Sequence, residues 1–200
     1  GMLDPETRGL FASIGIQKDE RFEPAARRKE TLREAALVGN ATARALVFSP
    51  RTDRTRIYEE RQWERIFPGG NHDWLKDGVR EVDARARYFT FATAVTPTME
   101  SPGVESSSDA AVTFHDGRGE LLDGSLAYTL TLPADVPAKY FWSLTVYDNR
   151  TFSMLQTSQR FPSILSGQQG LRRNEDGSTT LVFGPNPPTD RKKRANWIQT

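Results

Sequence analysis

The sequence predicts an α+β protein in which a helical N-terminal segment is followed by a jelly-roll-like antiparallel β-sandwich. Apolar residues in the first half of the chain recur at the spacing of an α-helix. From Ala110 onward the apolar period changes to two, and turn residues separate several short runs. The change falls at the segment ESPGVESSS, residues 100–108. We therefore expect a helical lead and connecting region over 1–105 and the sandwich over 106–200, packed together as one compact unit.

Two helices are predicted in the first half. Small and apolar residues repeat over 32–46, which indicates a helix of about 20 residues that ends before Ser49. Ala35, Gly39 and Ala43 form a flat stripe on it that suits close packing against another element. A second apolar repeat over 75–95, after Asp73 as a plausible N-cap, predicts another helix.

The second half predicts strands and tight turns. Runs at 112–114 and 126–132 indicate two strands joined by a hairpin or a bulged loop. The apolar stretch 140–147 is typical of a central strand that is covered on both faces. The residues NEDG at 174–177 predict a turn ahead of a strand over 179–183. Short strands at this spacing favour a jelly-roll-like sandwich.

Composition excludes several classes of protein. The chain has 27 basic and 26 acidic side chains and a net charge of +1, so it carries no overall field for a nucleic-acid partner. No apolar run approaches the length of a membrane span, so we expect a soluble protein. Cysteine is absent, which excludes disulfides and thiolate sites and leaves a cytoplasmic or an exported location open. Gly1 before Met2 is typical of the remnant of a removed purification tag, so the native N-terminus is open too.

Polar residues after the stretch 140–147 form the candidate site. Such side chains at one rim of a sandwich could orient a sugar or a small organic acid, and an aromatic ring could stack on a pyranose. The alternatives are a simple turn, in which the Asp pairs with the nearby Arg, and a tryptophan that packs in the core. We predict no metal or cofactor, because His72 and His115 lack metal-ligand spacing. The candidate ligand-binding residues are Tyr147, Asp148, Arg150, Gln156, Arg160 and Trp197.

Several segments carry a family resemblance. The segments FWSLTVYDNRTFSMLQTSQRFPS, DGSTTLVFGP and NWIQT resemble the C-terminal module of a bacterial family known as domain of unknown function 1214, which often follows a companion module numbered 1254. The segments EAALVGNATARAL and YEERQWERIFPGGNHDWLKDGVREVDARARYF resemble its helical connecting region. The resemblance implies a jelly-roll-like sandwich behind helices and no settled activity.

Relatives of this kind continue past NWIQT into another apolar strand, whereas this sequence stops at Thr200. A sandwich without that strand would leave unpaired backbone groups at a sheet edge. We therefore expect either a homodimer that pairs along this edge or N-terminal residues in the empty slot.

Three functions remain open on the sequence. The first is a binding or accessory module for a carbohydrate-like or other small ligand. The second is a glycosidase-like hydrolase that uses rim carboxylates, although the separation of two acids is not readable from one sequence. The third is a structural module without its own activity. The basic run RKKR at 191–194 is by default a solvated loop, with nucleic-acid contact as a minor alternative.

Overall fold

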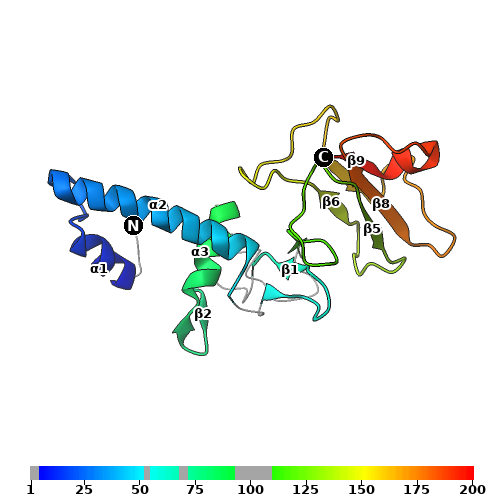
Figure 1. The fold of residues 1–200 in the computed structure, drawn as a ribbon. Coiled ribbons are helices and arrows are strands. Elements are labelled where there is room, and N and C mark those ends of the chain that lie inside the picture. Colours follow the sequence, from blue (N-terminus) through cyan, green and yellow to red (C-terminus); the bar gives the residue numbers. More distant parts are fainter. Residues whose placement is uncertain (1–4, 52–54, 68–71, 93–109) are drawn as a thin grey trace. The chain divides into compact units, whose positions relative to one another are not determined.

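The structure is a computed structural model that describes residues 5–51, 55–67, 72–92 and 110–200 (Figure 1). The chain divides into two compact units, residues 1–112 and residues 113–200. The boundary that the sequence predicts, between 105 and 106, falls outside the described residues and stays a prediction. No helix in the described ranges is long and apolar enough to cross a membrane.

The described residues of the first unit form the α-helices α1 (Pro5–Ser13), α2 (Ala26–Phe48) and α3 (Val82–Phe91). The prediction of a long helix ending before Ser49 is confirmed by α2, and Ser49 N donates to Ala45 O at its end. Burial on α2 is confined to its last turn, at Leu46 and Val47. The predicted packing stripe is wrong at its centre, because no described neighbour lies within 4 Å of a Cβ placed on Gly39.

The second predicted helix is wrong in its first part. Residues Leu75–Lys76 (β2) and Val79–Arg80 (β3) form an antiparallel hairpin, and α3 begins only at Val82. Asp77 and Gly78 both have positive φ, 51° and 77°, which is the backbone of a two-residue type I′ turn. This Asp-Gly turn signal outweighs the helical spacing of the apolar residues around it. The residue before α3 is Glu81, not the predicted cap Asp73.

An aromatic cluster forms the core of the first unit. Trp74, Ala84 and Tyr88 are buried there, with Phe67 packed against them. The Phe67 and Trp74 ring centroids are 5.1 Å apart in an edge-on arrangement, and those of Trp74 and Tyr88 are 5.3 Å apart. Beside this core, β1 (Glu64–Arg65) pairs antiparallel with β4 (Ala111–Val112). Trp74 is therefore a core residue and not an exposed platform.

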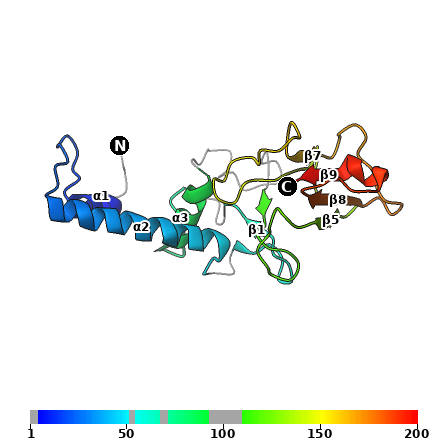
Figure 2. The same ribbon diagram turned by 45° about the horizontal axis from the view of Figure 1, so that its top comes forward.

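The second unit is built from five short strands. β8 (Thr179–Gly184) is the middle strand of a three-stranded sheet, with β5 (Tyr128–Leu132) antiparallel on one side and β9 (Trp197–Gln199) parallel on the other (Figure 2). β6 (Ser143–Thr145) and β7 (Ser163–Leu165) form a separate antiparallel pair. A short 3₁₀ helix, η3 (Arg191–Asn196), leads into β9.

One hydrophobic cluster joins these two sheets. Ile164 on β7 is buried with Leu181 on β8 and Ile198 on β9, and half-buried Trp142 and Leu144 pack against them. The α+β class is therefore confirmed, with helices in the first unit and small sheets that share a core in the second. The jelly-roll arrangement stays a prediction.

The predicted hairpin between 112–114 and 126–132 is wrong. Val112 pairs with Glu64 of β1, and β5 pairs with β8, about fifty positions further along the chain. A smaller hairpin forms instead, in which His115 bridges Leu121. The alternation of apolar residues predicts the face of β5 correctly, but it carries no information about which strand lies beside it.

The predicted central strand 140–147 is also wrong in extent and coverage. Only Ser143–Thr145 is strand, and β6 pairs on one side only, with β7. Tyr140 and Tyr147 are exposed, with 84% and 56% of their surface accessible. The turn at 174–177 is confirmed, because Gly177 N donates to Asn174 O and Gly177 has a φ of 82°.

Candidate ligand-binding site

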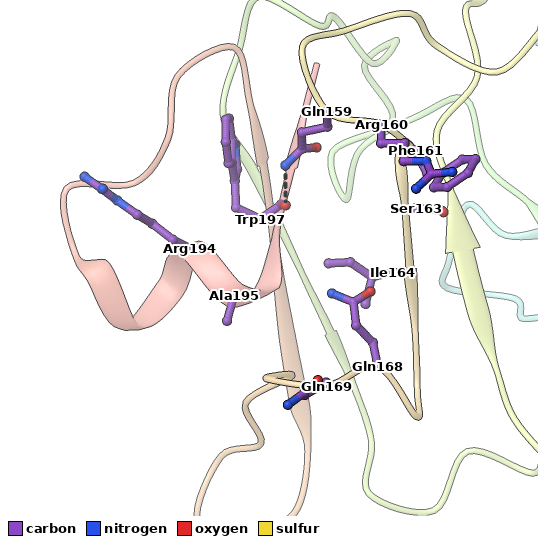
Figure 3. A pocket seen from close by; sticks show the side chains of 10 residues that line it. All are labelled: Gln159, Arg160, Phe161, Ser163, Ile164, Gln168, Gln169, Arg194, Ala195 and Trp197. Carbon is purple, nitrogen blue, oxygen red and sulfur yellow. Dashed lines mark hydrogen bonds between the residues drawn. The ribbon is translucent and has the colours of Figure 1, made fainter.

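An open pocket of about 430 Å³ lies on the second unit, between the segment 159–169 and the wall made by η3 and β9 (Figure 3). Its size is within the range of small-molecule sites. We call it the β7–β9 pocket. The residues that line it are Gln159, Arg160, Phe161, Ser163, Ile164, Gln168, Gln169, Arg194, Ala195 and Trp197.

The apolar part of the β7–β9 pocket is held by the core. Ile164 is only 3% exposed and belongs to the cluster that joins the two sheets. Trp197 Nε1 donates to Gly184 O at 3.0 Å, which fixes the plane of the indole. The pocket therefore has a preformed apolar surface.

Buried Asn196 positions the wall of the pocket. Its Nδ2 donates to Arg172 O at 2.7 Å and to Thr180 O at 2.9 Å, and its Oδ1 accepts from Arg172 N at 2.9 Å. These three hydrogen bonds, on one side chain that is 5% exposed, tie the end of η3 to Thr180 on β8 and to the backbone of Arg172. Sequence reasoning missed this residue, because asparagine after a basic run has no signature of its own.

Gln159 binds the outer edge of β9. Its Nε2 donates to Trp197 O at 3.1 Å, and its Oε1 accepts from Gln199 N at 2.8 Å. The side-chain amide thus replaces a peptide group of a neighbouring strand. Ser158 supports it, because its N and Oγ both donate to Gln199 Oε1. This part of the sheet edge is already occupied, and a homodimer through an open edge stays a prediction.

Three polar side chains at the β7–β9 pocket are exposed and have no hydrogen-bond or ion-pair partner among the described residues: Arg160, Gln168 and Gln169. Arg160 lies over the Phe161 ring, with its Cζ 5.3 Å from the ring centroid. Gln168 extends along the pocket beside Ile164 in Figure 3. Arg194 lines the pocket too, but its guanidinium points away, and its Nε donates to Pro188 O at 3.0 Å.

Only two of the six predicted site residues, Arg160 and Trp197, line this pocket. Gln156 Nε2 donates to Met154 O at 3.2 Å, and Tyr147 bridges Met154. These two residues are therefore engaged in the segment that follows β6. A ligand-binding role for the predicted residues outside the pocket stays a prediction.

Asp148 and Arg150 are brought together in one turn. Asp148 Oδ1 accepts from Thr151 N at 2.9 Å and from Arg150 N at 2.8 Å, and Arg150 Nη2 lies 3.9 Å from Asp148 Oδ2. The backbone N–H groups of Thr151 and then Arg150 hold the pKa of Asp148 below its ordinary value. This geometry is the turn that the sequence offered as the alternative to a binding rim.

Acidic residues of the second unit lie mainly in turns of this kind. Backbone or serine N–H and O–H donors likewise lower the pKa of Asp116, Asp123 and Asp176. None of the ten pocket-lining residues is a carboxylate. Within the described ranges, no group of three or more His, Cys, Asp or Glu side chains could hold a metal ion.

The first unit contains a buried ion pair that no pattern in the sequence indicates. Arg87 Nη2 donates to Glu64 Oε2, which also accepts from Thr55 Oγ1 at 3.4 Å. All three residues are buried, and Arg87 Nε and Nη1 have no hydrogen-bond partner among the described residues. Burial lowers the pKa of Arg87, and the charge of Glu64 opposes that shift.

Comparison with known proteins places the second unit in a family. No curated protein matches the chain. Among solved structures, the crystal structure of the VPA0106 protein from Vibrio parahaemolyticus is similar at 17% identity and a TM-score of 0.43, over 97% of this chain and 42% of that one. The chain therefore spans less than half the length of that protein. Residues 108–200 match the family described as protein of unknown function DUF1214, which confirms the predicted resemblance over this segment.

Proposed function

We propose that residues 113–200 form a binding module for a small carbohydrate-like ligand, held in the β7–β9 pocket. One observation carries the proposal: Arg160, Gln168 and Gln169 surround a fixed apolar surface, and no described residue satisfies their polar groups. Polar groups that fix the orientation of a ligand over an apolar surface are the usual composition of a small-molecule site.

The chemistry of the pocket fits a sugar ring. A glutamine amide donates two hydrogen bonds and accepts through its oxygen, so Gln168 and Gln169 can match hydroxyl groups in either role. Ile164 and Phe161 are the aliphatic and aromatic lining residues that could contact the C–H face of a ring, and Trp197 also lines the pocket. Of the predicted site, Arg160 and Trp197 are retained, and the two glutamines are added.

The alternative functions have less support. A glycosidase-like hydrolase needs two carboxylates beside the bond that it cleaves, and the residues lining the β7–β9 pocket provide none. A structural module without activity would show no ligand at all, so it is an outcome of the same experiment. The shared core of the two sheets is compatible with the jelly-roll-like sandwich that the family resemblance implies.

The test is calorimetric titration of the 200-residue protein with a panel of neutral sugars, sugar acids and small organic acids. Replacing Gln168 and Gln169 together by Ala should weaken binding about tenfold or more, because each lost hydrogen bond contributes about 0.5–1.5 kcal/mol. Both side chains are exposed, so the melting temperature should not change.

Gln156→Ala is the matched control, because Gln156 is an exposed glutamine outside the pocket lining. It should leave affinity unchanged. Absence of heat across the whole panel, or equal weakening by the control, would reject the binding module in favour of a structural one.

A further inference from the structure

We propose that the ligand of the β7–β9 pocket carries a carboxylate and that Arg160 binds it; this inference rests on the proposed function. The ligand class is then an acidic sugar or a related hydroxy acid, not a neutral sugar.

The charged side chains that line the pocket favour an anionic ligand. Two of the ten lining residues are arginines, and none is acidic. Arg194 is turned away and is bonded to Pro188 O, so Arg160 is the lining cation that is available to a ligand. Arg160 has no acidic partner within the described residues. A cation without a counter-charge at a ligand-sized pocket favours a negative ligand.

The geometry favours a planar anion. The Arg160 guanidinium lies over the Phe161 ring at 5.3 Å, and this contact restricts the orientation of its plane. A guanidinium is planar and can donate two parallel N–H bonds to a carboxylate. The Gln168 and Gln169 amides then remain available for hydroxyl groups of the same molecule.

The cations around the pocket add positive potential, but none of them provides a second direct contact to the bound molecule. Helix η3 carries four successive cations, of which only Arg194 lines the pocket. A single guanidinium facing the pocket balances one negative charge. We therefore favour a carboxylate over a phosphate, which carries more charge and recruits several donors.

Calorimetric titration with matched sugars distinguishes a neutral ligand, a carboxylate and a phosphate. The sugars are D-glucose, D-glucuronate and D-glucose 6-phosphate, which share one ring and differ at C6, together with the D-galactose and D-galacturonate pair. The uronate of at least one pair should bind about tenfold or more tightly than its neutral partner, since a hydrogen bond to a charged group contributes more than a neutral one.

Arg160→Gln should abolish that preference, so that the uronate and its neutral partner bind this variant with similar affinity. Arg160→Lys should restore it only in part, because lysine keeps the charge without the planar fork. Arg150→Gln is the control, because Arg150 pairs with Asp148 and does not line the pocket. The melting temperature of Arg160→Gln should match that of the parent, since Arg160 is exposed and forms no ion pair with any residue that the structure describes.

The other possible results of these titrations each contradict this inference, the proposed function or both. Equal binding of neutral and acidic sugars, or a uronate preference that survives Arg160→Gln, would reject this inference and leave the proposed function standing. Tighter binding of the 6-phosphate than of glucuronate would reject the carboxylate. No binding of any arm would reject the proposed function and this inference with it.

Discussion

Single polar residues of the second unit differ in what their side chains are bonded to. The Asp148 carboxylate is occupied by the N–H groups of its own turn, whereas Arg160, twelve positions later, has no polar partner in the described chain. Both residues belong to the same predicted rim, and residue type alone does not distinguish them. The difference depends on the backbone: a turn follows Asp148, and an extended segment follows Arg160.

Asp148→Ala should lower the melting temperature without changing ligand affinity. The substitution leaves the N–H groups of Arg150 and Thr151 without their acceptor. Thermal unfolding followed by circular dichroism measures the first effect, and calorimetry measures the second. Asp135→Ala is the control, because that exposed side chain forms no hydrogen bond or ion pair within the described part of the chain. Loss of ligand affinity with an unchanged melting temperature would show that Asp148 belongs to the binding site.

Glu64→Ala should destabilise the first unit by about 3–5 kcal/mol, because it leaves the Arg87 guanidinium buried without a counter-charge. Amide hydrogen exchange in α3 reports this locally. Replacing both partners, Glu64→Leu with Arg87→Met, should recover much of the loss. Glu30→Ala breaks the exposed pair with Arg33 and should change stability by less than about 0.5 kcal/mol. Equal effects of the two single substitutions would contradict the account of a buried pair.

At the level of elements, patterns among neighbouring residues predicted the helix and the turn, which form between neighbouring residues. The helical spacing located α2, and the NEDG turn located the start of β8. Where two local signals competed, at Asp77-Gly78, the tight turn prevailed over the helical period. Strand pairing was not predictable, because β5 meets β8 through a core assembled from distant segments. The pocket depends on that pairing, so its composition was not predictable either.

At the outer edge of β9, a side chain bonds the backbone groups that would otherwise pair with a neighbouring strand. Gln159 bonds both Trp197 O and Gln199 N, where a further strand would otherwise pair. Gln159→Ala should therefore lower the stability of the second unit by about 1–3 kcal/mol, since two partly buried backbone groups lose their partners. Amide exchange at Gln199 should accelerate most.

Gln156→Ala is again the matched control, because Gln156 bonds only Met154 O on an exposed segment. Sedimentation of Gln159→Ala gives an independent result. If the capped edge prevents pairing between copies, this variant should associate more strongly with concentration than the parent. An unchanged amide exchange rate at Gln199 would show that the cap does not stabilise β9.

For the whole molecule, acid stability follows from the turn aspartates. The pKa values of Asp116, Asp123, Asp148 and Asp176 are all lowered in the folded protein. The unfolded value is about 3.9, so the unfolded chain binds more protons in acid. Stability from these groups is complete above that value and is lost as the pH falls through the lower folded values.

Urea unfolding of the second unit should therefore give the same midpoint at pH 7 and pH 5 and a lower one below about pH 4. Replacing Asp148 and Asp176 by Asn should reduce that acid dependence. A midpoint that falls equally in the parent and in this variant would assign the acid sensitivity to other groups.

The central claim is that the β7–β9 pocket binds a small polar ligand. Its most direct test is a ¹H–¹⁵N correlation spectrum of the 200-residue protein during separate titrations with D-glucose, D-glucuronate, D-galactose and D-galacturonate. With at least one of these sugars, we expect shifts at the side-chain amides of Gln168 and Gln169 and at the Trp197 indole, with none at the Asp148 turn. Shifts confined to that turn, or a spectrum that none of the four sugars changes, would contradict the account.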